Sequence, residues 1–479
     1  MSKRVENKTK CCLLTDFGST FTKISLVDLD QAKLLGQASA FTTITTTVLE
    51  GFTEAFEQLR AVVDLDQVDI GSKLACSSAG GGLKLISIGL APDFTVEAAR
   101  RAALGAGARI LKSYSYYLDN EDLKEIESLQ PDIILLSGGE NGGNKKCIIA
   151  NAGVLAKLSI SVPIIVAGNV DAKNQIDEIF LAAGNDYYFT ENVMPSVNHL
   201  NVDPVRGLIR QIFMEQIIKA NGMKDVQGAI SNVIMPTPTA VLVAAELLSK
   251  GAGQYAGLGD IMVVDIGGAT TDIHSVSAPV QDHSLFYDGM EEPASKRTVE
   301  GDLGMRYSAL SLFESLGEAS FLKYCDDMVD IKAECIFRTL NPNFVPLDQP
   351  AKEFDEVIAK NCVATATLRH SGTIRRSYLN GKNVMVQSGK DLRNIKYVIG
   401  TGGVIVNSTA PYEILKCSIL DEDRVLAPTA PSLILDKEYL LAAMGLLSSQ
   451  YPEIAFRILT DNLLTLKPFL SETLSGCKR

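Results

Sequence analysis

One pattern occurs twice in this 479-residue chain and limits its possible folds more than any other feature. Residues 11–29, CCLLTDFGSTFTKISLVDL, hold an apolar run, Asp16, a short turn of small and hydroxylated residues, and a second apolar run. Residues 261–277, IMVVDIGGATTDIHSVS, repeat that order around Asp265. Two apolar runs joined by a tight turn predict a β-hairpin, and two matching copies predict a duplicated fold.

The composition restricts the class of protein. Hydrophobic residues make up 46% and charged residues 21%, which is typical of a folded domain, and the length favours more than one domain. The net charge of −12 argues against nucleic acid as a partner, which would need a basic face. The sequence contains no run of eighteen apolar residues, so it does not predict a membrane-spanning helix. Nine scattered cysteines without a C-x-x-C pair favour a reducing cytoplasm over a disulfide or zinc framework.

The expected elements divide the chain into three parts. Residues 1–83 form the first half of the duplicated fold, completed by a helix near 236–250 and by the C-terminal helices. Residues 84–232 alternate strands and helices, which predicts an inserted α/β subdomain with a parallel sheet. Residues 233–479 form the second half, with a helical insertion at about 317–395 that contains a hairpin signal at Asn380-Gly381.

The two hairpin tips have the chemistry of a phosphate site. Glycine lets backbone N–H groups approach phosphate oxygens, and serine or threonine hydroxyls add donors. Asp16 and Asp265 would repel phosphate unless a divalent cation lay between, and Mg²⁺ is typically held by one or two carboxylates together with substrate phosphates. Asp272 follows the second tip and can orient a water for attack. A single hairpin of this kind is usually an ordinary turn, but two matching copies favour nucleotide.

A third glycine turn, IGTGGVIVN at 399–407, lies between an expected buried strand and a helix. It lacks the G-x-G-x-x-G spacing of a dinucleotide site, but its glycines allow a flat ring or a ribose to approach closely. Alone it is a weak signal, because many strand-to-helix turns contain Gly-Gly.

The three turns, in this order, resemble the phosphate-1, phosphate-2 and adenosine motifs of the actin/heat-shock chaperone/sugar kinase ATPases. PTPTAVLVAAELL (236–248) and YLLAAMGLL (439–447) are similar to the two connecting helices of that fold. LLTDFGSTFTK, CSSAGGGLKLISIGL, PDIILLSGGENGGN and VVDIGGATTDIHSV together resemble the MutL/GlmL family, accessory proteins of adenosylcobalamin-dependent glutamate mutase and related mutases. That family shares only a name with the mismatch-repair protein.

The resemblance implies a duplicated ribonuclease H-like fold, with two lobes around a cleft for ATP or ADP and Mg²⁺. It implies metal coordination by Asp16 and Asp265, with Asp272 as the second acid of the phosphate-2 motif. We expect contacts to nucleotide from Gly18, Ser19, Thr20, Lys23, Gly267, Gly268, Thr270, Thr271, Gly400, Gly402 and Gly403. One departure is Thr237, which stands where chaperone ATPases carry a glutamate before Pro-Thr-Ala. Hydrolysis is therefore expected to be slow or to use another acid.

Other motifs have simpler explanations. Asp272-Ile273-His274 starts like the cobalamin motif D-x-H-x-x-G but ends in Ser277, so we expect a structural histidine and cobalamin on a partner. SSAGGGL (77–83) is either another phosphate cradle or a plain glycine turn. Ser137-Gly138-Gly139 ends a parallel strand, where ligands often bind, although a strand-to-loop turn explains it better. Glu300 or Asp302 can touch nucleotide, but helix capping explains Asp302 equally well.

The leading hypothesis is a Mg²⁺-dependent ATPase that acts as a chaperone, releasing damaged cofactor from an adenosylcobalamin-dependent mutase, with residues 84–220 as the region that contacts it. A small-molecule kinase of the same fold is the alternative, although DIGGATTD is closer to the hydrolase branch than to the G-D-Q-x-A of sugar kinases. An ATP-driven electron donor to another radical enzyme would need clustered thiolates at a dimer interface, and the spacing of Cys325 and Cys335 does not support that.

Overall fold

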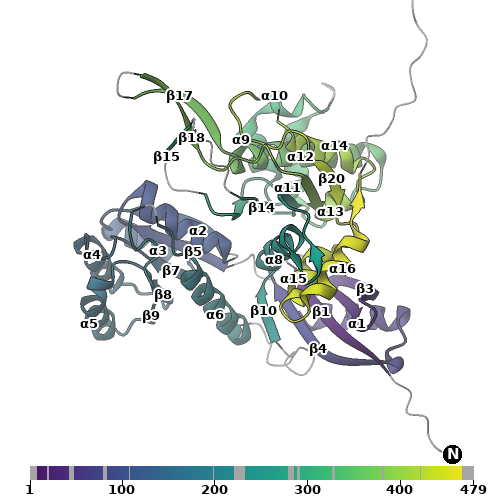
Figure 1. Cartoon of the computed structure of the whole chain (residues 1–479), viewed down its shortest axis with the longest axis horizontal. Helices are drawn as coiled ribbons and strands as arrows, with labels where there is room; N and C mark the ends of the chain where they lie inside the picture. The colour runs from purple at the N-terminus through teal and green to yellow at the C-terminus, as the bar shows by residue number, and fades with distance from the viewer. Residues whose placement is uncertain are drawn as a thin grey trace, which may run out of the picture. The chain divides into compact units, whose positions relative to one another are not determined.

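The computed structural model describes residues 8–18, 21–42, 48–78, 83–106, 108–197, 199–220, 232–278, 285–288, 292–325, 329–379, 382–420 and 422–466. The chain divides into two compact units, which we describe separately (Figure 1). Unit 1 comprises Met1–Ala244, Gly289–Glu291 and Ala442–Ile458, and unit 2 comprises Ala245–Asp288, Glu292–Leu441 and Leu459–Arg479. No helix of the described residues is long and apolar enough to cross a membrane.

The first repeat forms a five-stranded sheet in unit 1 with the order β10-β4-β1-β2-β3. β1 (Thr9–Phe17), β2 (Phe21–Asp28) and β3 (Lys33–Phe41) form an antiparallel meander, and β4 (Val68–Ser77) and β10 (Asn232–Pro236) continue the sheet in parallel. The helix α1 (Val48–Val62) packs against β2 and β3. The run Cys11–Leu14 is buried throughout, as expected of a central strand that is covered on both faces.

The second repeat forms a sheet of the same design in unit 2, with the order β16-β14-β13-β19-β20-β21. β13 (Ile261–Ile266), β14 (Thr271–Val276) and β16 (Ser295–Glu300) form the antiparallel meander, and β19 (Tyr397–Thr401) and β20 (Ser432–Leu435) run parallel to β13. Only the short strand β21 (Leu464–Thr465) has no counterpart in the first sheet. The matching order and direction of five strands confirm the duplicated ribonuclease H-like fold.

Two helices that resemble the connecting helices of the ATPase fold meet in unit 1. These are α8 (Thr237–Lys250) and α15 (Leu440–Ser448). A Cβ atom on Gly445 would lie 1.9 Å from the carbonyl oxygen of Ala240, so the two backbones touch there and only glycine fits.

The insert is a parallel five-stranded sheet with the order β6-β5-β7-β8-β9, as its alternating pattern predicted. Its strands are β5 (Leu83–Gly89), β6 (Ala108–Ser115), β7 (Ile133–Leu136), β8 (Ile164–Val166) and β9 (Tyr187–Phe189). One face packs on α2 (Glu97–Gly105) and α6 (Asp203–Ala220), in a core that continues into the first repeat. The other face packs on α3 (Asn120–Leu129), α4 (Lys146–Leu155) and α5 (Lys173–Ala183).

Helices cover one face of the second sheet in unit 2. They are α9 (Ala309–Leu316), α10 (Glu318–Phe321), α11 (Ile331–Leu340) and α12 (Gln349–His370), with α13 (Gly403–Asn407) and α14 (Pro411–Leu415) beside them. A separate small sheet joins β15 (Phe286–Asp288) to the hairpin β17 (Thr373–Leu379) and β18 (Lys382–Ser388). The expected hairpin is present, while its tip, Asn380-Gly381, lies outside the described residues.

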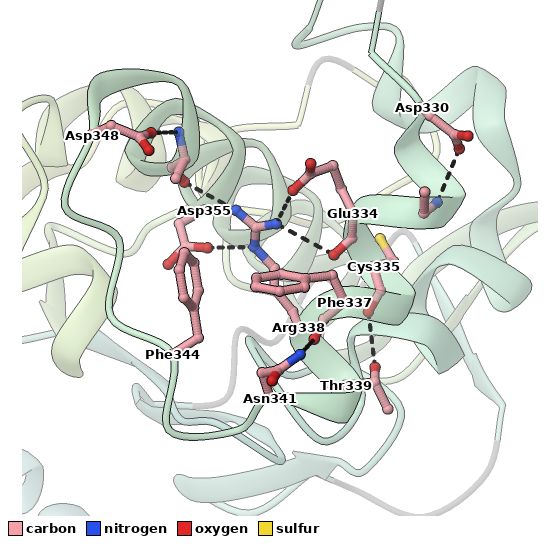
Figure 2. A network of polar contacts seen from close by, with 12 residues as sticks. Asp330, Glu334, Cys335, Phe337, Arg338, Thr339, Asn341, Phe344, Asp348 and Asp355 are labelled. Atoms are coloured by element: carbon pink, nitrogen blue, oxygen red, sulfur yellow. Dashed lines mark hydrogen bonds and ion pairs between the residues drawn. The ribbon is translucent and has the colours of Figure 1, made fainter.

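A buried ion network fixes this helical layer (Figure 2). Arg338 of α11 is fully buried and its Nε donates to Asp355 Oδ1 of α12 at 2.7 Å. Arg306 donates to both oxygens of the same carboxylate, at 3.2 and 2.7 Å. Glu334 forms a further ion pair with Arg338, and the Phe344 ring lies within cation–π distance of both guanidinium groups. Asp355 therefore compensates the buried charge of Arg338 and the mostly covered charge of Arg306.

Candidate functional site

The first turn begins at Asp16, which lies near the end of β1 and pairs in register with Lys23 of β2. The backbone N–H of Gly18 donates to the carbonyl of Phe21 at 3.0 Å, and a Cβ atom on Gly18 would lie 2.6 Å from that oxygen. The turn is thus closed by backbone contacts that require glycine. Ser19 and Thr20, which we predicted to bind phosphate, lie outside the described residues, as does the whole glycine run of SSAGGGL.

The Asp16 carboxylate is held by two side chains from neighbouring strands and helices. Thr237, at the start of α8, donates its hydroxyl to Asp16 Oδ1 at 2.6 Å. The Cys76 thiol, on β4, donates to the same oxygen at 3.4 Å. Burial raises the pKa of Cys76 well above its usual range, so the thiol stays protonated and acts as a donor. Both contacts end on Oδ1 and leave Oδ2 as the natural ligand for a hydrated metal.

The second turn, Gly267 to Thr270, is held from behind by the segment that follows β16. The backbone N–H groups of Met305 and Arg306 donate to the carbonyls of Gly267 and Gly268 at 3.1 and 2.8 Å. Ser308 Oγ donates to the carbonyl of Ala269 at 2.6 Å. Since Arg306 also belongs to the Asp355 ion network, the turn is tied through it to α12.

Asp272 has partners that local sequence reasoning did not foresee. Arg297 of β16 contacts Asp272 Oδ1 at 2.6 Å, and Thr270 donates its hydroxyl to Oδ2 at 3.2 Å. Both oxygens are therefore engaged, and the carboxylate fixes the position of the Thr270 hydroxyl. The predicted role of Asp272 in orienting a water stays a prediction and would have to compete with these contacts.

Thr271, another predicted nucleotide contact, is the first residue of β14. Its side chain is buried, and its hydroxyl donates to the carbonyl of Leu303 at 2.9 Å. Thr270 lies in the preceding turn, where it contacts Asp272, and the predicted nucleotide contact of Thr271 stays a prediction. This geometry explains Thr271 as a residue that fastens the loop after β16.

The third turn lies directly beside the second. Asp265 of β13 is in register with Thr401 of β19, and a Cβ atom on Gly402 would lie 2.3 Å from the carbonyl oxygen of Ile266. Gly402 has a φ of +97°, which disfavours any side chain. Gly400 faces inward, where a Cβ would clash with Leu415, and Gly403 begins α13. Unit 2 thus brings Asp265, the second turn and the third turn to one edge of its sheet.

Sequence reasoning missed polar residues at this edge. Asp436, after β20, is buried and accepts hydrogen bonds from the backbone of Leu440 and Leu441 at 2.8 and 3.2 Å. Burial and the carboxylates of Asp436 and Asp265 raise the pKa of Tyr439 to about 12. Asn407 donates to the hydroxyl of Tyr439 at 3.2 Å. The capping pattern of an aspartate just before an apolar helix would have indicated Asp436.

The close approach of Gly402 to the Ile266 carbonyl can be tested by substitution. Gly402→Ala is expected to destabilise unit 2 by roughly 1–3 kcal/mol, because the methyl group meets the Ile266 carbonyl and the backbone lies in a region that L side chains avoid. Gly403→Ala is the matched control and should change stability by less than about 0.5 kcal/mol, since its nearest neighbour is 4.0 Å away. Urea unfolding of the two variants checks this. Equal losses would mean that the close approach at Gly402 is not present.

The residues for which the sequence offered a simpler explanation than ligand binding contact other protein groups or are buried in the core. His274 is fully buried, and burial together with Arg297 holds its pKa well below the usual range, so the ring is neutral. Asp302 and Glu300 both bind Arg369, at 2.7 and 2.8 Å, which occupies the two carboxylates that we had considered for nucleotide. Cys335 is buried in α11, and burial raises its pKa to about 12.

Comparison with known proteins decides the family. The family described as MutL protein matches residues 12–463. The chain belongs to the MutL protein family. A relative named Protein MutL from Clostridium tetanomorphum is 48% identical over 456 residues, which span 94% of this chain and 99% of the relative. The similarity therefore covers all three turns and the insert.

Solved structures show weaker similarity. A gluconate kinase from Lactobacillus acidophilus has a TM-score of 0.37 at 12% identity, covering 96% of this chain and 93% of the kinase. A glycerol dehydratase reactivase has a TM-score of 0.33 at 10% identity, covering 91% of this chain and 99% of the reactivase. The family assignment rests on the sequence match, and the fold assignment rests on the strand order of the two sheets.

Proposed function

We propose that this MutL family member binds and hydrolyses MgATP and uses the cycle to reactivate an adenosylcobalamin-dependent mutase, glutamate mutase or a related aminomutase. The observation that carries the proposal is the duplicated sheet. In each copy an aspartate stands near the end of the first strand, ahead of a glycine turn. In the second copy a further glycine turn, at Gly402, packs against the same strand end.

The side chains around the aspartates fit Mg²⁺. Asp16 and Asp265 are carboxylates at strand ends, and both are partly exposed to solvent. Carboxylate oxygen is the ligand that Mg²⁺ prefers, and Asp16 Oδ1 is already oriented by Thr237. When bound, the ion would neutralise charge on the transferring phosphoryl group.

The chain's own residues supply the rest of the site. The N–H groups of Gly18 and Gly267 close the two turns on the carbonyls of Phe21 and Thr270 at 3.0 and 2.8 Å, and at the second tip the Gly268 N–H is the donor that phosphate oxygens would approach. Asp272 and Arg297 hold the Thr270 hydroxyl in a fixed direction. Gly403 leaves room for the flat part of a nucleotide, since a Cβ atom there would meet the Tyr439 hydroxyl only at 4.0 Å.

Slow hydrolysis suits a conformational machine. Thr237 brings a hydroxyl to Asp16 where related ATPases carry a carboxylate, so no acid from that position activates the attacking water. Nucleotide states then persist long enough to hold one conformation of a bound mutase. Shifting a mutase from 1:99 to 99:1 between two conformations takes about 5.5 kcal/mol of differential binding. Nucleotide binding typically couples to such a change by about 1–3 kcal/mol, so repeated cycles are expected.

The test is recovery of a mutase that has been inactivated by turnover. Inactivated glutamate mutase is incubated with the chain, MgATP and fresh adenosylcobalamin, and activity is followed over time. Recovery is expected with MgATP and not without nucleotide, and the Asp16→Asn variant should not support it. Recovery no better than in the nucleotide-free control would contradict the proposal. ATP consumption that appears only when a small metabolite is added would favour the kinase alternative.

A further inference from the structure

Three successive carbonyls of the second turn accept hydrogen bonds from one later segment, residues 305–308. The pairs are Gly267 with Met305 N–H at 3.1 Å, Gly268 with Arg306 N–H at 2.8 Å, and Ala269 with Ser308 Oγ at 2.6 Å. The two backbones also touch, because a Cβ atom on Gly304 would lie 2.6 Å from the carbonyl carbon of Ala269. The later segment therefore fixes the peptide units of the turn from one side.

The fixed carbonyls set the direction of the N–H groups in the same peptide units. The peptide bonds are trans, and in a trans peptide unit the N–H group points away from the carbonyl. Holding the three carbonyls toward residues 305–308 therefore turns the N–H groups of Gly268, Ala269 and Thr270 toward the opposite side of the turn. Within the described part of the chain, no group accepts a hydrogen bond from these three N–H groups.

Successive N–H groups that point to one side form a nest for an anion. In a hydrogen-bonded four-residue turn, the carbonyl of the first residue accepts from the N–H of the fourth. Here the Gly267 carbonyl accepts from Met305 instead, which leaves the Thr270 N–H outside the turn's own hydrogen bonds. The Thr270 side chain is fixed as well, because its hydroxyl donates to Asp272 Oδ2 at 3.2 Å. The direction of the third donor is thus set before a phosphate arrives.

Ser308 holds the turn with its side chain and gives up its usual role to do so. It stands at the N-cap position of α9, where a serine hydroxyl normally accepts a backbone N–H of the first helical turn. Ser308 makes no such bond, and its hydroxyl is directed at the carbonyls of Ala269 and Gly301, at 2.6 and 2.8 Å. The Leu310 N–H is capped by the Thr339 hydroxyl at 3.1 Å. A threonine from α11 thus caps the helix, and the serine contacts the turn.

The attachment of α9 to the sheet does not depend on this hydroxyl. Ala309 and Leu312 of α9 are fully buried in the core of unit 2, so apolar packing already fixes the helix. The hydroxyl of Ser308 fixes the peptide unit between Ala269 and Thr270, and with it the direction of the Thr270 N–H. The contact therefore serves the geometry of the turn.

We propose that Ser308 is a positioning residue of the phosphate site, whose hydroxyl holds the Ala269 carbonyl and directs the Thr270 N–H toward a phosphate oxygen of MgATP. The inference rests on the proposed function, which brings MgATP to this turn. It adds to that function the residue that sets the third donor of the nest. Met305 and Arg306 hold the turn through their backbone N–H groups, so among the three, Ser308 is the one whose contact a side-chain substitution can remove.

The test is calorimetric titration of the full chain with MgATP. Ser308→Ala removes the hydroxyl and should weaken MgATP binding about 10-fold, because a hydrogen bond to a charged group typically contributes at least that factor. Ser308→Thr keeps the hydroxyl and should restore the wild-type affinity. The matched control is Ser371→Ala, which should bind MgATP like the wild type. Ser371 is 9% exposed against 8% for Ser308, and its hydroxyl donates at 2.7 Å to the carbonyl of Thr367, which is not part of the turn.

A second measurement separates positioning from a general loss of stability. Hydrogen exchange in residues 266–272 is compared at saturating MgATP, where the wild type and the variants are equally occupied. The wild type and Ser308→Thr are expected to be protected there by MgATP. Ser308→Ala should be protected less, since its Thr270 N–H no longer faces the phosphate. A merely structural Ser308 would instead speed exchange in α9 and leave the MgATP-dependent protection of the turn unchanged.

Three results would overturn the inference. One is a Ser308→Ala variant that binds MgATP as tightly as the wild type, and another is an equal loss of affinity in Ser371→Ala. The third is full protection of the turn in Ser308→Ala at saturating MgATP. If the wild type bound no MgATP, the proposed function would fall together with the role of Ser308. Tight binding by both the wild type and Ser308→Ala would remove only that role.

Discussion

Asp355→Ala is expected to destabilise unit 2 by about 3–5 kcal/mol, because it leaves the buried guanidinium of Arg338 and the mostly covered one of Arg306 without their shared carboxylate. Arg338 is fully buried and cannot reach water in compensation, although it keeps Glu334. Asp355→Asn should lose less, since the amide oxygen can still accept a hydrogen bond. Urea unfolding read out by hydrogen exchange in α11 and α12 measures the effect in unit 2 itself, which a single melting temperature of a two-unit chain would not.

The chain offers a matched control in Asp288→Ala. Asp288 also binds an arginine at 2.8 Å, Arg375, but both side chains are more than half exposed. Such a pair contributes about 0–1 kcal/mol. If the two variants lost the same stability, the Arg338 network would not be compensating buried charge. The Asp355 variant is also expected to weaken MgATP binding, because Arg306 supports the second turn through its backbone.

The duplicated fold could be predicted from the sequence because the same local hairpin pattern occurs twice. An apolar run, an aspartate, a glycine turn and a second apolar run predict the β1–β2 and β13–β14 hairpins without any long-range information. Finding the pattern twice was enough to predict the duplicated sheet, and the alternation of strands and helices predicted the parallel sheet of the insert. The position of the third turn beside the second was not predicted and follows from the register of β13 with β19.

Contacts between distant residues were not predictable in this way. Thr237 binds Asp16 across 221 positions in the sequence, and the pattern showed only that a glutamate was missing. Arg338 and Asp355 are 17 residues apart on different helices, and a charged residue in an amphipathic helix is normally assigned to the solvent face. Arg297 and Asp272 meet only because β14 and β16 are neighbours in the sheet.

These distant contacts have one consequence in common. Each of the two aspartate turns is held by a residue from a later element of the chain. Thr237 at the start of α8 holds the first turn, and Arg306 after β16 holds the second. The Asp16 carboxylate therefore depends on the start of α8, and the backbone of the second turn depends on the segment behind β16. This makes the turns sensitive to movements of α8 and α12, which is what a nucleotide-driven machine requires.

Thr237→Val is expected to weaken the response to Mg²⁺ about 10–100-fold, because it removes the hydroxyl that orients Asp16 while keeping the side chain's shape. The loss should show as a higher Mg²⁺ concentration for half-maximal ATP hydrolysis, with a smaller change in the rate at saturating Mg²⁺. Steady-state hydrolysis across a Mg²⁺ titration measures both quantities. A purely structural threonine would instead lower the amount of folded protein and leave the Mg²⁺ midpoint unchanged.

Three further variants make the result interpretable. Thr237→Ser keeps the donor and should restore the Mg²⁺ midpoint to within a few-fold of the wild type. Asp16→Asn removes the charge itself and should cost at least about 100-fold in hydrolysis, more than Thr237→Val. Asp69→Asn changes an exposed carboxylate on β4, in the same sheet, and should have no effect. If valine and serine at position 237 behaved alike, the 2.6 Å contact would not be positioning Asp16, and the proposed metal site would lose its main structural support.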